Sequence, residues 1–326
     1  VLALAAGALL VFSGPGRELQ RAVALRELTR AVDGTVRLGA LRVVSWRTIE
    51  ALDVAFADRA GRPVLGAQLV RATFAPLDLM RGRFVFLRVR LIRPSVDLRQ
   101  DAAGRWNVAR LFRSRPDTAR LGRRPLVDLR DVRVTLGELA VQPSGRTRPL
   151  RFVGVQLDLR RLRVSHPDSA ALVAEVRHVA FRSADPAVRV KRGYGHVEVG
   201  PDSVAVRLDE FELPGGALSF RGVYRGGGAA PTYAFAGKAE RFQFADFAWL
   251  SPQLPREGGG TLTLRAERAA DGTARWDVSE ADVRTGGSRL HGRVRVGVGG
   301  SRGTVIEMLD VTAGPLDLAV VAPWLG

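Results

Sequence analysis

The chain has 326 residues, no cysteine and a formal net charge of +17. The lack of cysteine excludes thiol catalysis, cysteine-ligated zinc, iron–sulfur clusters and disulfide bonds. Its 50 basic residues include only two lysines, Lys191 and Lys238, and the arginines are spread along the chain instead of forming the cluster expected of a nucleic-acid footprint. We therefore expect a solvated surface studded with arginine. The alternative is an arginine-rich surface that meets anionic lipid headgroups or nucleic acid.

The N-terminal region predicts a membrane segment followed by a helix. Residues 1–12 are apolar and do not begin with methionine, but a bilayer span needs about 20 such residues. We interpret them as the tail of a transmembrane anchor, with the hydrophobic region of a signal peptide as the alternative. Residues 17–32 have apolar positions near helical spacing, and Gly34 is a plausible stop. Residues 1–33 are thus expected to hold a truncated anchor and an amphipathic helix.

From Thr35 onward the apolar residues alternate with polar ones, which indicates strands with one apolar and one polar face. A first block, residues 34–112, contains five expected strands and ends in a short helix or loop at 105–112. The basic segment 113–124, which contains Pro116, reads as an exposed connection. The five expected strands are 35–44, 48–57, 62–74, 83–92 and 94–100.

The second block, residues 125–326, continues the alternation between Gly- and Pro-rich turns, a spacing that suits antiparallel hairpins. A faint repeat links Ala75–Leu79 to Gly314–Leu318, each beside an apolar segment. The expected fold class is mainly β: an N-terminal anchor helix followed by a long antiparallel sheet with short crossing helices. A parallel α/β core is disfavoured because its strands would read as continuous apolar blocks.

The sequence shows no convincing catalytic or metal-binding constellation. The four histidines, His166, His178, His196 and His291, are far apart, and no nucleophile elbow or phosphate-binding loop is present. Two carboxylates on distant strands could still make a glycosidase. We expect no enzyme activity, no catalytic, cofactor-binding or metal-binding residues, and no cofactor. The five tryptophans are expected to pack in the sheet, with lipid contact as the alternative; they are Trp46, Trp106, Trp249, Trp276 and Trp324.

Several motifs of the first block resemble those of AsmA-like proteins, and among these the TamB-type translocation and assembly proteins. They follow the apolar start and the amphipathic helix. The motifs are Gly34–Leu41, Gly61–Leu65, Leu87–Leu98 and Asp101–Val108, the last being similar to the "dG-x-WN" signature of the family. The resemblance covers about residues 1–112. The later strands match TamB-type repeats in style more than in motif.

The resemblance implies a repeating β-groove, which is a long, curved sheet that is apolar inside and polar outside. It also implies a single N-terminal anchor in a bacterial inner membrane with the bulk of the chain in the periplasm. Members of the family are implicated in phospholipid transport between inner and outer membranes and in outer-membrane protein assembly. The implied partners are phospholipid acyl chains, the inner membrane and an outer-membrane barrel assembly partner, with no nucleic acid.

The alternation supports the same interpretation, because a sheet with an apolar face and no covering helices leaves an apolar trough. Burial of an acyl chain there would offset about 0.8 kcal/mol per CH₂. If the apolar stripe faces inward, twelve aliphatic residues are expected to line the trough: Leu87, Val89, Leu91, Val132, Val134, Val153, Val155, Leu157, Val204, Val206, Val294 and Val296.

Four other functions compete with lipid transport. A strand chaperone for outer-membrane proteins would use the sheet edge, and a structural β-rich scaffold would use no groove at all. An outer-membrane barrel fits poorly because aromatic residues make up only 7% of the chain. A basic nucleic-acid binder is the weakest candidate.

Overall fold

A computed structural model describes residues 32–315 and five isolated positions between 18 and 29. Gaps fall at 81–82, 103–104, 112–126, 165–171, 186, 201, 227–230, 249–254, 256 and 300–302. Over these residues the protein is mainly β, with sixteen strands and few helices, which confirms the expected class. The expected anchor lies outside the described residues, as do the connection 113–124 and most of the expected N-terminal helix.

The chain divides into two compact units, one of residues 1–166 and 181–185 and the other of residues 167–180 and 186–326. The expected boundary at 113–124 thus falls within the first unit. Elements of the first unit are β1 (Thr35–Arg37), β2 (Ala40–Ser45), β3 (Thr48–Ala57), β4 (Pro63–Phe74), α3 (Pro76–Met80), β5 (Phe84–Arg99), α4 (Asn107–Leu111), β6 (Val127–Gln142) and β7 (Leu150–Val164).

Strand β8 (Leu172–Ala184) divides between the two units. The second unit continues with β9 (Ala187–Val199), β10 (Ser203–Glu212), β11 (Ala217–Arg225), β12 (Thr232–Gln243), the 3₁₀-helix η3 (Phe244–Phe247), β13 (Gly259–Arg268), β14 (Ala274–Thr285), β15 (Ser288–Val298) and β16 (Thr304–Ala313).

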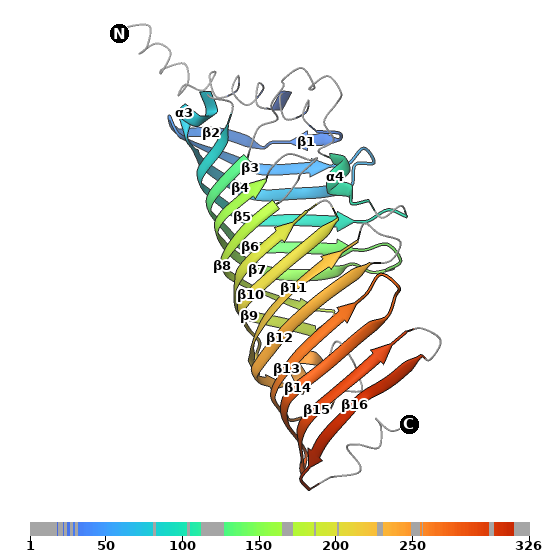
Figure 1. Ribbon diagram of the computed structural model, residues 1–326. Coiled ribbons are helices and arrows are strands. Elements are labelled where there is room, and N and C mark those ends of the chain that lie inside the picture. Colours follow the sequence, from blue (N-terminus) through green and yellow to red (C-terminus); the bar gives the residue numbers. More distant parts are fainter. Residues whose placement is uncertain are drawn as a thin grey trace. The chain divides into compact units, whose positions relative to one another are not determined.

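In the first unit the strands lie side by side in the order β1-β3-β4-β5-β6-β7, with β2 paired to β3 (Figure 1). The pairs are antiparallel except β5 and β6, which run parallel. A parallel pair needs a crossover connection, and the chain between Arg99 and Val127 provides it, with α4 at its start. The parallel pair departs from the expected antiparallel sheet.

The second unit is a meander in which β9 to β16 pair in sequence order, all antiparallel. The turn between β13 and β14 shows how sequence makes these hairpins. Gly272 has φ 84°, which glycine adopts without strain. The Asp271 carboxylate accepts hydrogen bonds from the Thr273 hydroxyl at 2.6 Å and from its backbone N–H at 2.9 Å. The hairpins expected from the Gly- and Pro-rich turns are therefore confirmed here.

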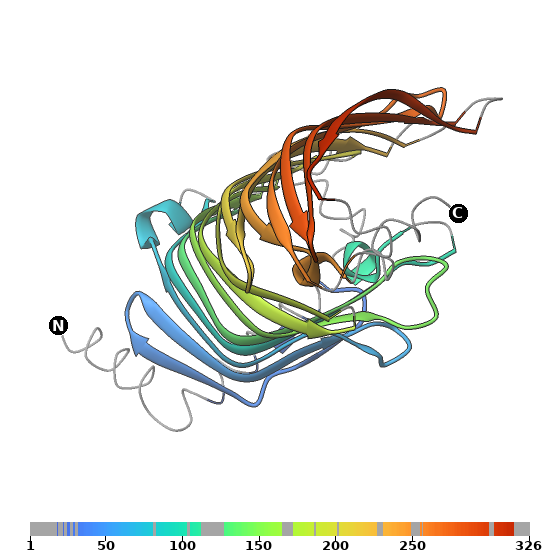
Figure 2. The ribbon, with the colours of Figure 1, turned by 90° about the horizontal axis from the view of Figure 1, so that it is seen from below.

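Bulges interrupt the ladders and bend the strands. In the first unit Asp53 in β3, Arg93 in β5 and Leu136 in β6 have positive φ, and the register between β6 and β7 shifts beside Leu136. Asp53 and Arg93 both lie at the level of Gln68 in β4, and Arg93 lies at the level of Leu136, so the three left-handed residues form a line across the sheet. A bulge bends its strand and increases the local twist, and Figure 2 shows the strands of this unit curving along their length.

The structure corrects one expected boundary. The expected strands 83–92 and 94–100 form a single strand, β5, in which Arg93 has a left-handed conformation with φ 47°. Pro94 follows it inside the ladder, where it pairs with Ala67, and the register with β4 is the same on both sides of Arg93. Arg93 and Pro94 therefore lie within one continuous strand.

Helix α4 closes the N-terminal end of the apolar face of the first unit. Leu111 and Val64 are each only 1% exposed, and Val32 joins them in a buried cluster. The Asn107 side chain fixes the helix to β5: its Oδ1 accepts from the N–H groups of Arg99 at 3.0 Å and Val108 at 2.9 Å. The Trp-Asn motif is therefore structural in this unit.

Candidate functional site

The apolar face of the first unit consists of cross-strand rows of aliphatic side chains. Directly paired residues place their side chains on the same face, so the register defines each row. One row is half-buried, and the adjacent row is almost fully buried. The half-buried row is Val70, Leu91, Val134 and Leu157, and the buried row is Ala72, Val89, Val132 and Leu159.

Five of the expected lining residues therefore lie together in this unit, and a sixth joins them. Val155 pairs with Gly137, and a Cβ placed on Gly137 would lie 3.0 Å from Val134 and 3.3 Å from Val155. Val134 and Val155 are thus on the same side of the sheet. The low exposure of Val132, at 4%, shows that the curved face buries its own side chains.

Two expected lining residues of the first unit leave the rows because of bulges. Leu87 is the extra residue between the pairs Phe74–Phe86 and Thr73–Arg88, and it is 37% exposed, against 8% for Val89. Val153 pairs with Glu138 across a register shift at Gly154, which has φ 63°. Unbroken alternation would have placed both in the trough.

The second unit presents an apolar face with three adjacent rows, and all four expected lining residues of this unit lie on it. Val204 belongs to the first row, Val206 and Val296 to the second, and Val294 to the third. The second row runs Val197, Val206, Gly222, Phe235, Ala266, Trp276, Val296 and Ile306. The third includes Leu208, Phe220, Leu264, Val278 and Leu309.

Aromatic rings cover the gaps that small residues leave on this face. Phe235 stacks on Phe220 at 5.3 Å and on Tyr233 at 5.2 Å, measured between ring centroids. A Cβ at Gly222 would collide with the Phe235 ring, so that ring occupies the space of the absent side chain. These aromatic residues were missed as lining candidates, although alternation along 232–236 places Tyr233 and Phe235 on the same face of the strand.

Ion pairs link β6 and β7 in the first unit. Asp128 has a side chain only 3% exposed and accepts hydrogen bonds from Arg161 Nε and Nη2, each at 2.8 Å. Arg130 adds a third partner at 3.2 Å. The hydrogen bonds from Arg161 and then from Arg130 lower the pKa of the Asp128 carboxyl against the opposing effect of burial.

This arrangement predicts acid sensitivity. Because the pKa of Asp128 is lower in the folded protein than in the unfolded chain, its stabilisation is complete above the ordinary value and is lost as pH falls from about 5 toward the folded pKa. We expect Asp128→Asn to lower the free energy of unfolding at pH 7 by about 1–3 kcal/mol and to flatten its decline in acid. Urea unfolding at several pH values checks this. A Glu240→Gln control, at a side chain 81% exposed, should do neither.

Where the structure describes them, the histidines and tryptophans singled out in the sequence lie on different elements. No group of three or more His, Asp or Glu side chains that could hold a metal ion occurs among the described residues. His196 lies on the polar face of β9, beside Arg207. Trp46 is 69% exposed beside the Arg47 guanidinium, and Trp276 is 42% exposed on the apolar face. Trp249, Trp324 and His166 lie outside the described residues.

Within the described part of the chain, no helix has the length and apolar character required to cross a membrane. No family model, curated protein or solved structure matches the chain.

Proposed function

We propose that the protein is a non-enzymatic lipid carrier whose apolar sheet faces hold phospholipid acyl chains. The observation that carries this proposal is the assembly of aliphatic and aromatic rows on one face of each unit. Because neighbouring strands extend each row, an acyl chain would meet continuous apolar surface within a unit. The polar face keeps its arginines in water, where many pair with carboxylates.

The energetics favour a distributed site over a single pocket. Each acyl CH₂ that leaves water gains about 0.8 kcal/mol, so contact with several rows would hold a chain without any directional bond. The half-buried rows, such as that of Leu91, Val134 and Leu157, still expose apolar surface that an acyl chain can contact.

The sequence resemblance supports a more specific proposal. Residues 1–112 resemble AsmA-like proteins of the TamB type, which suggests an inner-membrane anchor and transport of phospholipids across the periplasm toward the outer membrane. The structural role of Asn107 and Leu111 gives the family-like Trp-Asn motif a physical reason in this chain.

Lipid analysis of the purified chain tests this function. We expect the protein, expressed in a bacterial host and purified without detergent, to carry phospholipid at about one or more molecules per chain, measured by quantitative mass spectrometry of an organic extract. The control is a globular protein of similar charge taken through the same steps. A folded chain that carries no more phospholipid than this control would refute the carrier.

One observation favours a second candidate, the strand chaperone. β16 is exposed over its whole length, with Ile306 at 62% and Leu309 at 66%, and among the described residues it pairs with β15 alone. An open, apolar edge can add an extended strand from another protein. Crosslinking from Ile306 to unfolded outer-membrane strands, with no phospholipid bound to the chain, would favour this function over lipid transport.

A further inference from the structure

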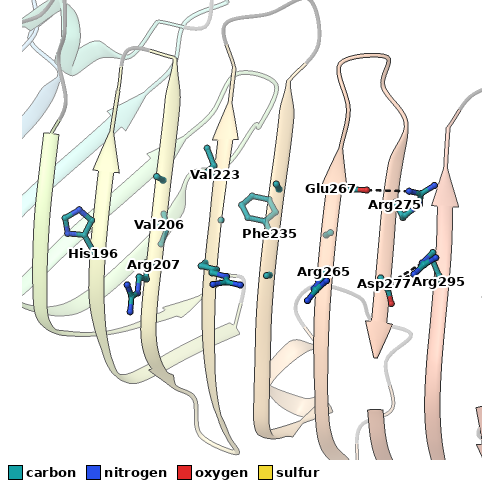
Figure 3. Close-up of a pocket in the computed structure, with 16 residues that line it drawn as sticks. His196, Val206, Arg207, Val223, Phe235, Arg265, Glu267, Arg275, Asp277 and Arg295 are labelled. Atoms are coloured by element: carbon teal, nitrogen blue, oxygen red, sulfur yellow. Dashed lines mark hydrogen bonds and ion pairs between the residues drawn. The ribbon is translucent and has the colours of Figure 1, made fainter. Parts of the chain in front are cut away.

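The polar face of the second unit contains a broad depression of about 670 Å³ (Figure 3). Most of its lining residues come from two adjacent polar rows on strands β9 to β15, and these include Arg275, Asp277 and Arg295. Four residues of the second apolar row, Val206, Gly222, Phe235 and Ala266, also line it, whereas Trp276 and Val296 of that row do not. The depression therefore lies mainly on the polar face.

The depression is positively charged. Five arginines and two carboxylates line it, a surplus of three positive charges with His196 neutral. The arginines are Arg207, Arg221, Arg265, Arg275 and Arg295, and the carboxylates are Glu267 and Asp277. Figure 3 shows Arg207 and Arg265 on either side of the strand that carries Phe235.

Three of these arginines already have carboxylate partners. Arg207 donates to Asp209 at 2.8 Å, Arg275 to Glu307 at 2.9 Å, and Arg295 to Asp277 at 2.8 Å. Asp277 also accepts from Arg293, and hydrogen bonds from Arg293 and then Arg295 lower the pKa of its carboxyl. Asp277 is thus fully engaged, although it lies directly opposite Arg265 in the ladder.

Arg221 and Arg265 form no ion pair with any residue that the structure describes. Arg221 lies directly opposite Arg207, a like-charge pairing that is unfavourable. Ala236 separates Arg221 from Arg265 in the same row. With strands about 4.8 Å apart, the two Cα atoms are about 10 Å apart, and the short Ala236 side chain leaves the space between the two arginines open.

We propose that Arg221 and Arg265 bind the phosphate group of an anionic ligand above Ala236. A phosphate monoester carries roughly −1.5 to −2 charge near neutral pH and several acceptor oxygens, which suits two planar guanidinium donors on opposite sides. Ala234 and Val223 beside them give an apolar floor for the rest of the ligand. A bound anion would also relieve the repulsion between Arg207 and Arg221.

The phosphate could belong to a lipid headgroup or to a free phosphate ester, since both present the same chemistry. Arg221 and Arg265 alternate along their strands with Gly222 and Ala266 of the apolar row, so the site does not depend on lipid carriage by the apolar rows. The Leu91→Asp variant, in the other unit, is therefore expected to bind phosphate as the wild type does. Failure of one proposal can thus be distinguished from failure of the other.

Isothermal titration of the full chain with inorganic phosphate and with dihexanoyl phosphatidic acid tests the site. We expect both to bind, and Arg221→Ala and Arg265→Ala each to weaken binding at least tenfold. Arg221→Lys keeps the charge but loses the planar guanidinium group, so its affinity should lie between those of the wild type and Arg221→Ala. The matched control is Arg189→Ala, an exposed arginine of β9 outside the depression, which should change affinity less than twofold.

The two probes separate the sources of the phosphate. At least tenfold tighter binding of phosphatidic acid, lost in the same variants, would identify a lipid headgroup, and equal affinities would identify a phosphate ester. Circular dichroism checks that each variant is folded. The proposal is overturned if neither probe binds, or if Arg189→Ala weakens binding as much as Arg221→Ala, since that would indicate unspecific attraction to a basic chain. Preferential binding of single-stranded DNA, with equal loss in all three alanine variants, would overturn it as well.

Discussion

Replacing Leu91 by aspartate is expected to reduce the phospholipid bound per chain at least tenfold. Leu91 lies in the half-buried row between Val70 and Val134, where an acyl chain would rest. A carboxylate there must stay hydrated, because burial of an unpaired charge costs several kcal/mol, so water would enter the row and the lipid would lose its contact. Quantitative mass spectrometry of lipid extracts checks this.

The bulges provide a matched control on the same strand. Leu87 is four residues away, but it is the extra residue of a bulge and is 37% exposed. Leu87→Asp introduces the same charge into the same strand, and we expect it to keep at least half of the bound phospholipid. Equal loss in the two variants would contradict the assignment of the face, because the effect would then follow charge instead of position.

A second pair of variants, at Val155 and Val153, tests the same assignment with an uncharged side chain in case Leu91→Asp does not fold. Val155 lies on the face of Val134, whereas Val153 lies opposite Glu138, and the bulge at Gly154 separates the two. Val155→Asn should release lipid and Val153→Asn should retain it. Circular dichroism and the urea midpoint show whether each variant is folded. Retention of lipid by a folded Val155→Asn would argue for a structural or strand-binding function.

Replacing Leu111 by alanine is expected to destabilise the N-terminal end of the first unit by about 2–5 kcal/mol. Leu111 is 1% exposed and packs with Val32 and Val64, so the substitution leaves a cavity between α4 and the sheet. Hydrogen–deuterium exchange resolved by peptide should show at least tenfold faster exchange in β1, β3 and β4. The rate in the second unit should not change.

Leu77→Ala is the control for this effect. Leu77 lies on α3, belongs to the same unit and is 69% exposed, so its loss should change stability by less than about 0.5 kcal/mol. If Leu111→Ala exchanges no faster than Leu77→Ala, α4 is not what holds this end of the sheet together. In that case the Trp-Asn motif would need another explanation.

The local alternation of apolar and polar residues was enough to predict which face many of the candidate lining residues take. Alternation in β15 predicted one face for Val294 and Val296, and the same reasoning applied to Val204 and Val206 in β10; the register places these residues in adjacent rows. It failed at Leu87 and Val153 because a bulge adds one residue and shifts which face the following side chains take. Nothing in a short sequence window distinguishes such a residue from its neighbours.

The sequence by itself determined that this chain forms strands with one apolar and one polar face, because side-chain alternation is a property of each strand alone. It also determined the hairpin turns, since Asp271-Gly272 needs only its own backbone and side chains. The tertiary structure decided the rest. The line that the left-handed residues Asp53, Arg93 and Leu136 form across the sheet depends on how β3 to β6 are aligned. The parallel β5–β6 pair and the free arginines at 221 and 265 depend on partners far away in the chain, which no local pattern encodes.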